Sequence, residues 1–434
     1  MSTNSSQDPS TPPAQCPHRS QAPLQPQAPP KLSPNAAMSA FRSVAHFVSK
    51  GVIRALKPVK IFAYETEVAP LKNAILSATT FVDFCLIFAN VQNDTMLLHE
   101  EVYGGSFLFG RGVMVVEHAR TARDITLPPL RGNNFMGVSI VASDANMFAT
   151  NAAILNQSTP ARGAARDFLD QNVFNKTWTQ DSVEDALAQT LSDWKSNPDM
   201  ANYLVIRAAV TRVFIKLLRD VDVPVDEATF VTQQYMQRFV ESSLFAGYFP
   251  AMLDLLGTYK AIREDAYFKL RARGIDLLTI DVTLFAAMFS VGTIVIRCVK
   301  LAKDNNLRYQ DLSPEKKLNF VYEAVRLQPT VTSVHRKLDD REQVEVAGHR
   351  ITLGVGDELV YPFVCSNRDE DVFPNAEKLD LNRPTSQRDA VLSWSRGAHV
   401  CPAKDLSIFV TIAMLDALSA RYDFATLDIF SPEF

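Results

Sequence analysis

The stretch WSRGAHVCPA, residues 394–403, decides how this sequence is interpreted. Its cysteine, Cys401, stands just before a strong helical pattern, KDLSIFVTIAMLDALSAR, in residues 404–421. Free backbone N–H groups and the positive end of the helix dipole favour a thiolate at such a position. Gly397 lets the chain form a tight loop, as the close approach of a flat ligand demands. From these residues alone, Cys401 is a buried core residue, a nucleophile or a metal ligand.

Further segments upstream of the cysteine carry a second pattern. A helical segment with glutamate and arginine three positions apart, EAVR, begins 78 residues before Cys401. Taken alone, such an i,i+3 pair on an exposed helix is worth only a few tenths of a kcal/mol. It is followed by two loop-like segments, NRDEDVFP at 367–374 and LDLNRP at 379–384. The pattern therefore gains its meaning from the order and spacing of all the segments together.

In order and spacing these segments resemble the heme-thiolate cytochrome P-450 family. Trp394, Gly397, His399 and Cys401 fit the family's ligand loop, with Trp in place of the usual Phe, and with Ala403 in place of the last Gly. The resemblance implies a mainly α fold with small β-sheets (α+β), in which helices surround a buried heme. It covers the C-terminal part of the chain well, and the first 270 residues only by general pattern.

The resemblance implies a role for each residue of a heme site. Cys401 would be the axial thiolate, the metal ligand of a heme b (iron protoporphyrin IX). Trp394 and Gly397 would hold the cofactor through the ligand loop, and His399 would contact a heme propionate. Arg336 would contact another propionate, and its alternative role is that of a solvated surface arginine.

The resemblance also implies a buried ion-pair network on the same side of the heme. Glu323 and Arg326 of the EAVR helix would pair with Arg383 of the second loop segment. On the other side, residues 149–166 do not offer the family's usual Trp or His and Arg partners of the propionates. The sequence therefore leaves the distal anchoring of the heme unassigned.

The most apolar helix pattern is DVTLFAAMFSVGTIVIRCVK, residues 281–300, which we expect to need protein on every side. Counting back from the EAVR helix places the family's oxygen-binding stretch on residues 286–290. Phe289 stands where the family has an acid, and Ser290 where it has a threonine. Ser290 and Thr293 are therefore the candidate catalytic hydroxyls, although Thr293 could equally bond its own helix backbone.

The same helix predicts an apolar substrate pocket. Phe285, Met288 and Phe289 would line it, and plain core packing is the alternative for all three. A pocket of this kind suits a lipid, a terpenoid or a similar apolar secondary metabolite.

Two enzyme classes and one class of binding protein follow. A monooxygenase would need electrons from a separate ferredoxin or NADPH reductase, because the sequence contains no flavin or dinucleotide fingerprint. Arg396 and Lys404 could bind an acidic redox partner, or they could be ordinary solvated charges. A peroxide-using or fatty-acid hydroperoxide-rearranging enzyme would need no reductase. The run of Cys401, Lys404 and Asp405 resembles the allene oxide synthase and hydroperoxide lyase branch. The third class is a catalytically silent binding protein.

Composition sets the frame around this domain. The 434 residues carry a net charge of -4, and this charge does not indicate binding to nucleic acid. Residues 1–37 hold nine of the 24 prolines and predict a disordered tail, so that residues 38–434 would form a single heme-thiolate catalytic domain. The first 64 residues hold seven basic residues and one acidic one, a charge of +6, which leaves -10 for the rest. This basic leader leaves organelle targeting open, and residues 38–60 predict peripheral membrane contact or a helix packed on the body.

The remaining patterns predict individual elements. Five cysteines without a CxxC pair indicate a reducing compartment. Residues 75–90 are the nearest approach to a membrane span, but they contain Asp83 and are interpreted as a buried core helix. We expect a hairpin at 106–118 before a helix from Ala119, strands within 343–362, and helices at 38–56, 181–195, 201–220, 226–244, 250–272 and, after an N-capping Ser313, 314–327.

Overall fold

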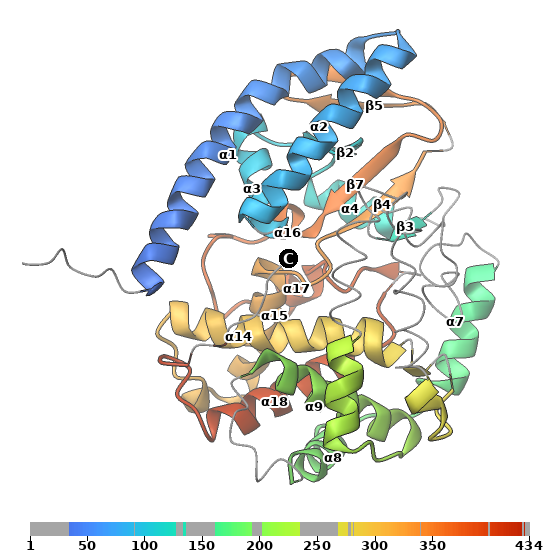
Figure 1. Ribbon diagram of the computed structural model, residues 1–434, viewed down its shortest axis with the longest axis vertical. Helices are drawn as coiled ribbons and strands as arrows, with labels where there is room; N and C mark the ends of the chain where they lie inside the picture. The colour runs from blue at the N-terminus through green and yellow to red at the C-terminus, as the bar shows by residue number, and fades with distance from the viewer. Residues whose placement is uncertain are drawn as a thin grey trace, which may run out of the picture. The chain divides into compact units, whose positions relative to one another are not determined.

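A computed structural model of the chain describes residues 34–90, 92–126, 133–135, 161–192, 202–234, 268–276, 279–280, 282–338, 340–397, 400–427 and 429. These residues are mainly helical with two small β-sheets (Figure 1), which confirms the predicted fold class. The first helix, α1 (Pro34–Glu65), begins at Pro34 rather than at residue 38, and it continues past the expected end with Pro58 inside it.

The larger sheet has the strand order β1-β2-β7-β4-β3. Its strands are β1 (Phe107–Phe109), β2 (Gly112–Met114), β7 (Glu358–Pro362), β4 (Ser333–Lys337) and β3 (Asn133–Phe135). Only the β2·β7 pair is parallel, with Val113 opposite Leu359. The second sheet pairs β5 (Glu342–Val346) with β6 (His349–Leu353).

These strands confirm the predicted hairpin at 106–118 and the strands within 343–362. Gly110 turns the hairpin at a φ of 58°, in the left-handed region that glycine tolerates. The following helix, α4 (His118–Thr126), begins one residue before the expected Ala119. Strand β4 was not predicted from the sequence.

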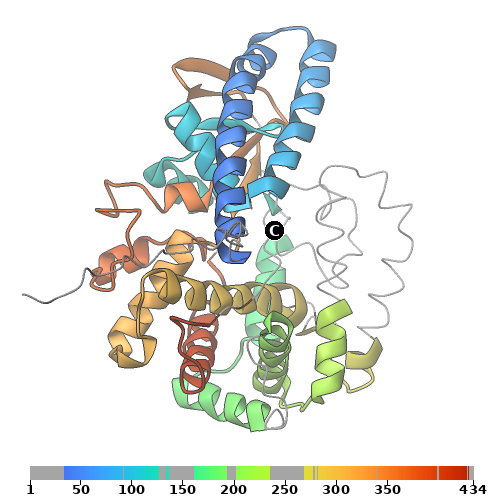
Figure 2. The ribbon, with the colours of Figure 1, turned by 60° about the vertical axis from the view of Figure 1, so that its left-hand side comes forward.

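Helix α2 (Ala69–Asn90) runs back alongside α1 (Figure 2). The buried Lys60 ammonium of α1 contacts the buried Asp83 carboxylate of α2, and the Asn90 side chain donates to the Ser49 hydroxyl at 2.6 Å. The interpretation of residues 75–90 as a buried core helix is wrong. Because Asp83 turns inward to Lys60, the opposite side of α2 faces outward, where Phe81 is 52% exposed.

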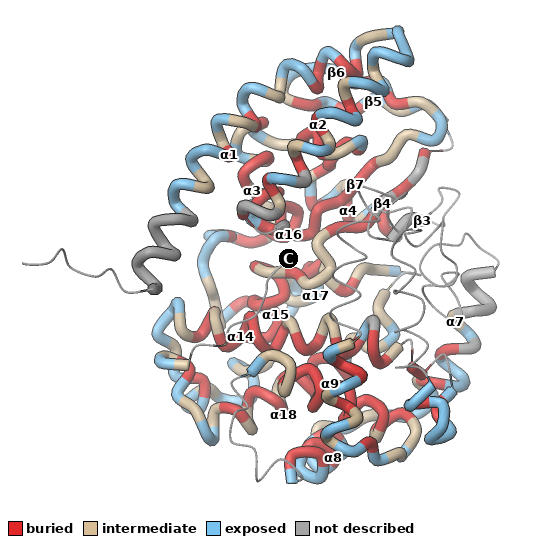
Figure 3. The backbone as a smooth tube through the Cα atoms, in the orientation of Figure 1, coloured by how far each residue is buried: buried red, intermediate tan, exposed pale blue. Residues whose placement is uncertain are grey.

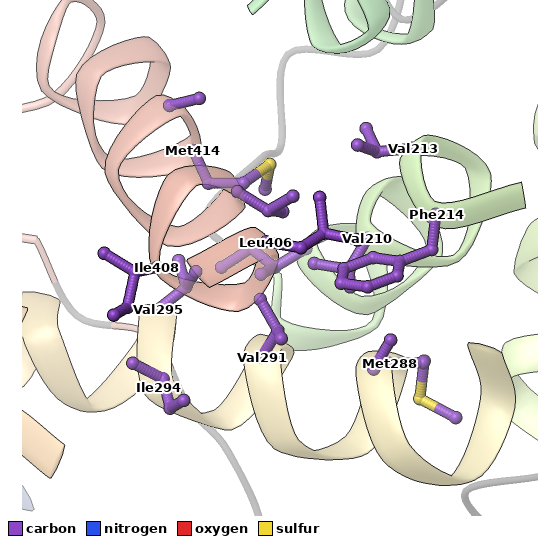
Figure 4. Packing of buried hydrophobic residues seen from close by; sticks show 14 of the residues in the cluster. Val210, Val213, Phe214, Met288, Val291, Ile294, Val295, Leu406, Ile408 and Met414 are labelled. Carbon is purple, nitrogen blue, oxygen red and sulfur yellow. The ribbon is translucent and has the colours of Figure 1, made fainter. Parts of the chain in front are cut away.

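The helical core is built around the central apolar segment (Figures 3 and 4). Its elements are α8 (Gln180–Ser192), α9 (Tyr203–Arg219), the π-helix η1 (Val282–Val291), α14 (Gly292–Asp304), α15 (Pro314–Leu327) and α18 (Lys404–Ser419). Met288 and Val291 of η1 belong to the cluster formed with Val210 of α9 and Leu406 of α18. The π-helical form was not predicted. Protein does not cover every side of η1 either, since Ala286 is exposed.

Further helices and turns lie elsewhere in the described part of the chain. They are α3 (Gln92–Tyr103), α7 (Ala161–Asn172), the 3-10 turn η2 (Tyr309–Asp311), α16 (Phe363–Ser366) and α17 (Thr385–Ala390). The Ser313 hydroxyl accepts from the Lys316 backbone N–H at 3.4 Å, which confirms the predicted start of α15. The expected helix at 226–244 is confirmed over its described part, since residues 225–234 are helical, and residues 268–271 of the expected helix at 250–272 are helical as well. The rest of both predictions lies outside the described residues.

Two described helical segments are long and apolar enough to cross a membrane, judged by length and composition alone. One is Val282–Asp304, which is 71% buried inside the protein, as a core helix should be. The other is Ala69–Ile87, which is only 24% buried.

Candidate functional site

The loop around Cys401 closes on itself just before α18. The Cys401 backbone N–H donates to the Trp394 carbonyl at 2.8 Å, and the Val400 N–H donates to the Gly397 carbonyl at 3.1 Å. Gly397 has a φ of 57°, so the tight turn uses the backbone freedom of glycine. The indole N–H of Trp394 donates to Ser407 Oγ of α18 at 3.2 Å and fixes the loop on the helix.

The electrostatics of Cys401 depend on burial and on nearby donors. Burial raises the pKa of the Cys401 thiol, and the Ala403 N–H, with the positive charges of Arg166 and Lys404, offsets only part of that rise. The thiolate therefore needs a further cation to be the stable form at neutral pH. Within the described residues no three His, Cys, Asp or Glu side chains gather as a metal cluster. A lone sulfur with backbone support fits the single axial ligand that the sequence resemblance implies.

Arg166 of α7 is a functional candidate that the sequence did not assign. Its Nη1 donates to the Val400 carbonyl at 2.7 Å, next to the candidate ligand, and its Nε bonds to Asp170 at 2.9 Å. The family's usual propionate partners are not found in residues 149–166 of the sequence. Arg166 instead binds the backbone of the ligand loop, 234 positions away along the chain. Nothing in the local sequence signals such a contact.

The structure brings Glu323, Arg326 and Arg383 together in a buried cluster. Arg326 donates two hydrogen bonds to the Glu323 carboxylate, from Nε to Oε1 at 2.6 Å and from Nη2 to Oε2 at 2.9 Å. Arg383 Nε donates to the same Oε1 at 2.9 Å, and the Asp380 N–H donates to Oε2 at 3.0 Å. Arg326 also donates to the Ala376 carbonyl at 2.6 Å. This cluster ties α15 to the loop before the Cys401 segment.

The two candidate hydroxyls of the central helix differ in their surroundings. Thr293 Oγ1 donates to the Phe289 carbonyl at 2.7 Å and accepts from Arg207 Nη2 at 2.8 Å. Its hydrogen is therefore committed to the helix backbone, as in the alternative considered from the sequence. Ser290 is half-buried, and its hydroxyl has no hydrogen-bond partner among the described residues. Ser290 is thus the hydroxyl that can still exchange a proton.

The residues predicted to line the pocket also differ from one another in burial. Met288 is fully buried in the core cluster of η1, α9 and α18 (Figure 4), so it packs the protein and does not line a pocket. This corrects its assignment, and the reason is that the Met288 side of the helix faces α9. Phe289 is half-buried and lies 5.4 Å from the Arg207 guanidinium. The side chain of Phe285 lies outside the described residues.

The remaining predicted residues are placed as follows. Arg336 is 5% exposed on β4, so the solvated surface alternative is wrong. His399 lies outside the described residues. Lys404 Nζ lies over the Tyr322 ring at 5.4 Å, and Arg396 donates to the Asp389 carbonyl. Contact of these two cations with an acidic partner stays a prediction.

No family model matches the chain. One segment of 81 residues is 37% identical to biflaviolin synthase CYP158A1 of Streptomyces coelicolor, and it covers 18% of each chain. Another of 88 residues is 36% identical to cytochrome P450 55A3 of Fusarium lichenicola, over 20% of this chain and 21% of that protein. A third, 29% identical over 119 residues, matches linoleate 10R-lipoxygenase of Aspergillus fumigatus, over 27% of this chain and 10% of that protein. The chain thus aligns with about a fifth or less of each curated relative.

Solved structures extend the likeness to the fold. The retinoic acid-bound cyanobacterial CYP120A1 superposes with a TM-score of 0.56 over 77% of this chain and 88% of its own, at 16% identity. Cytochrome P450 CREJ, in complex with (4-ethylphenyl) dihydrogen phosphate, superposes with a TM-score of 0.54 over 70% of this chain and 83% of its own, also at 16% identity. At these identities the superpositions establish the fold alone.

Proposed function

We propose that this chain is a heme-thiolate monooxygenase of the cytochrome P450 superfamily, because short segments of it are similar to two curated P450s and its fold matches solved P450 structures. Its substrate would be an apolar small molecule such as a lipid, a terpenoid or another secondary metabolite. Its cofactor would be heme b held by Cys401. The observation that carries the proposal is the closed loop that presents Cys401 before α18, with Arg166 bound to the adjacent Val400 carbonyl.

The residues around Cys401 suit a thiolate bound to iron. When bound, the heme would supply oxygen chemistry, and the Cys401 thiolate would raise the electron density at its iron. The Ala403 N–H and the nearby Arg166 and Lys404 would temper the charge of the sulfur. Arg336, buried on β4, would face a carboxylate of the cofactor.

We assign proton handling to Ser290, because of what its neighbours on the central helix can do. Thr293 holds its proton on the Phe289 carbonyl, and Phe289 stands where the family has an acid. Proton transfer at this site would then depend on the Ser290 hydroxyl, with water or a substrate group in place of the missing carboxyl. A separate ferredoxin or NADPH reductase would supply the electrons.

A two-arm assay tests the choice of oxidant. The full chain, loaded with heme, receives NADPH with a surrogate redox chain in one arm and a linoleate hydroperoxide without any electron donor in the other. We expect oxygen-dependent oxidation of apolar substrates in the first arm. Rapid consumption of the hydroperoxide in the second arm, with no turnover in the first, would overturn the monooxygenase proposal.

We further propose that α1 contacts a membrane surface. At 100° per residue, one face of the helix is uncharged and outward-facing, and it holds Val44, Phe47, Val48, Gly51, Ala55, Val59 and Phe62. Phe47 is 79% exposed and Phe62 is 52% exposed. Residues 43–64 contain no acidic side chain, and the exposed Arg54 lies beside this face, which suits an anionic lipid surface.

Vesicle sedimentation tests this contact. We expect the full chain to sediment with vesicles of anionic phospholipid, and the double variant Phe47→Ser with Phe62→Ser to remain in solution. Phe268→Ser is the matched control, because Phe268 is 73% exposed outside α1. Equal sedimentation of the double variant and the control would contradict the contact.

A further inference from the structure

The central helix changes its winding at a defined point. The π-helix η1 ends at Val291, and α-helical winding resumes at Gly292 in α14. A π turn contains one more residue than an α turn, so carbonyls near such a junction lose their regular intrahelical donors. Met288 and Phe289 are the residues one turn before the junction, and Phe289 precedes the candidate hydroxyl of Ser290.

A single side chain from another helix binds both of these carbonyls. Arg207 of α9 donates through Nη1 to the Phe289 carbonyl at 2.8 Å and to the Met288 carbonyl at 3.2 Å. Its Nη2 donates to Thr293 Oγ1 at 2.8 Å, and Thr293 in turn donates to the Phe289 carbonyl. The guanidinium thus spans the junction from its π side to its α side.

Gly292 makes room for this contact. A Cβ placed on Gly292 would lie 2.8 Å from Cγ of Arg207, closer than real Cβ contacts come, and 3.7 Å from its Cα. Alanine at this position would therefore have to displace the Arg207 side chain or the helix. In an ordinary exposed helix the same change stabilises.

The charge of Arg207 is not explained by an ion pair. The side chain is buried, its Nε has no hydrogen-bond partner, and its hydrogen-bond acceptors among the described residues are two carbonyls and one hydroxyl. Burial lowers the pKa of Arg207 to about 10, so the group stays cationic at neutral pH. Burying a cation without a carboxylate partner costs free energy. The contacts of Arg207 indicate which part of the structure this cation stabilises, namely the π-to-α junction.

We propose that Arg207 is a positioning residue that holds the π-to-α junction of the central helix and thereby sets the place of Ser290. The Arg207 cation of α9 thus fixes the turn around Phe289 in the central helix, where Phe289 stands in place of the family's acid. The contacts of Arg207 with the junction do not depend on a bound cofactor or on the proposed function. Their consequence for proton delivery by Ser290 rests on the proposed function.

Hydrogen–deuterium exchange of the full chain tests the hold on the junction. We expect Arg207→Met and Gly292→Ala each to speed amide exchange in residues 286–294, on the order of tenfold, with Arg207→Lys in between. Arg212→Met is the matched control, because Arg212 is equally buried on α9 but donates to the Val223 and Thr190 carbonyls. The control should speed exchange near those two residues instead.

A second readout tests the consequence for chemistry. In the heme-loaded chain, Arg207→Lys and Gly292→Ala should divert several-fold more of the supplied electrons to hydrogen peroxide, with the thiolate absorption band unchanged. Exchange in 286–294 that is the same for Arg207→Met, Gly292→Ala and Arg212→Met would overturn the positioning role. Faster exchange with unaltered electron diversion would overturn its link to Ser290. If the wild-type chain shows no oxygen-dependent turnover, the proposed function fails while the exchange result still decides the junction.

Discussion

Glu323→Gln is expected to lower the free energy of unfolding by about 3–5 kcal/mol, because it leaves two buried cations without their carboxylate. Arg326 and Arg383 both bind Glu323 Oε1, at 2.6 and 2.9 Å, and all three side chains are at most 3% exposed. The Asp380 N–H loses its charged acceptor as well. Since a whole domain is stable by only about 5–15 kcal/mol, this one change removes a large part of the total.

Urea denaturation followed by tryptophan fluorescence measures this effect. The matched control is Asp416→Asn, which removes the partner of Lys317 on the same helix, α15. That ion pair, with an N···O distance of 2.6 Å, is 21% and 36% exposed, so its loss should cost less than about 1 kcal/mol. A Glu323→Gln variant that is no less stable than Asp416→Asn would contradict the role given to the cluster.

Cys401→Ser is expected to reduce turnover to background while changing the free energy of unfolding of the heme-free chain by less than about 1 kcal/mol. Serine fills nearly the same space and can accept the Ala403 N–H, but it cannot give iron the electron density of a thiolate. The assay is the oxygen-dependent arm with the surrogate redox chain, together with the urea midpoint.

Cys298→Ser should give the opposite pattern. Cys298 is fully buried in α14, away from the ligand loop, and burial raises the pKa of its thiol. A hydroxyl there would cost about 1–3 kcal/mol of stability, but turnover per folded molecule should persist. Loss of turnover in Cys298→Ser alone would contradict the assignment of Cys401.

Local patterns made several elements predictable. Ser313 followed by proline gave the start of α15, and the glycines around Arg111 gave the hairpin of β1 and β2. The helix after Cys401 was visible because its apolar run follows directly on a proline. In each case the signal lies within a few residues of the feature that it predicts.

Features that depend on distant partners were not predictable in this way. Helix period shows that α2 has an apolar side, but not that Asp83 turns inward to Lys60 and leaves Phe81 outside. Arg166 donates to a backbone carbonyl that is far away along the chain. The contacts of Arg207 with the central helix depend on a π turn, which no residue pattern predicts. The ligand loop could be found because its residues are neighbours in sequence.

The proposed function requires that Cys401 bind the iron of a heme as a thiolate. The most direct measurement is the absorption spectrum of the reduced, CO-bound full chain beside that of Cys401→Ser. We expect the thiolate-heme Soret band in the wild-type chain and its loss in the variant. A wild-type chain without that band, or a variant that keeps it, would contradict the claim.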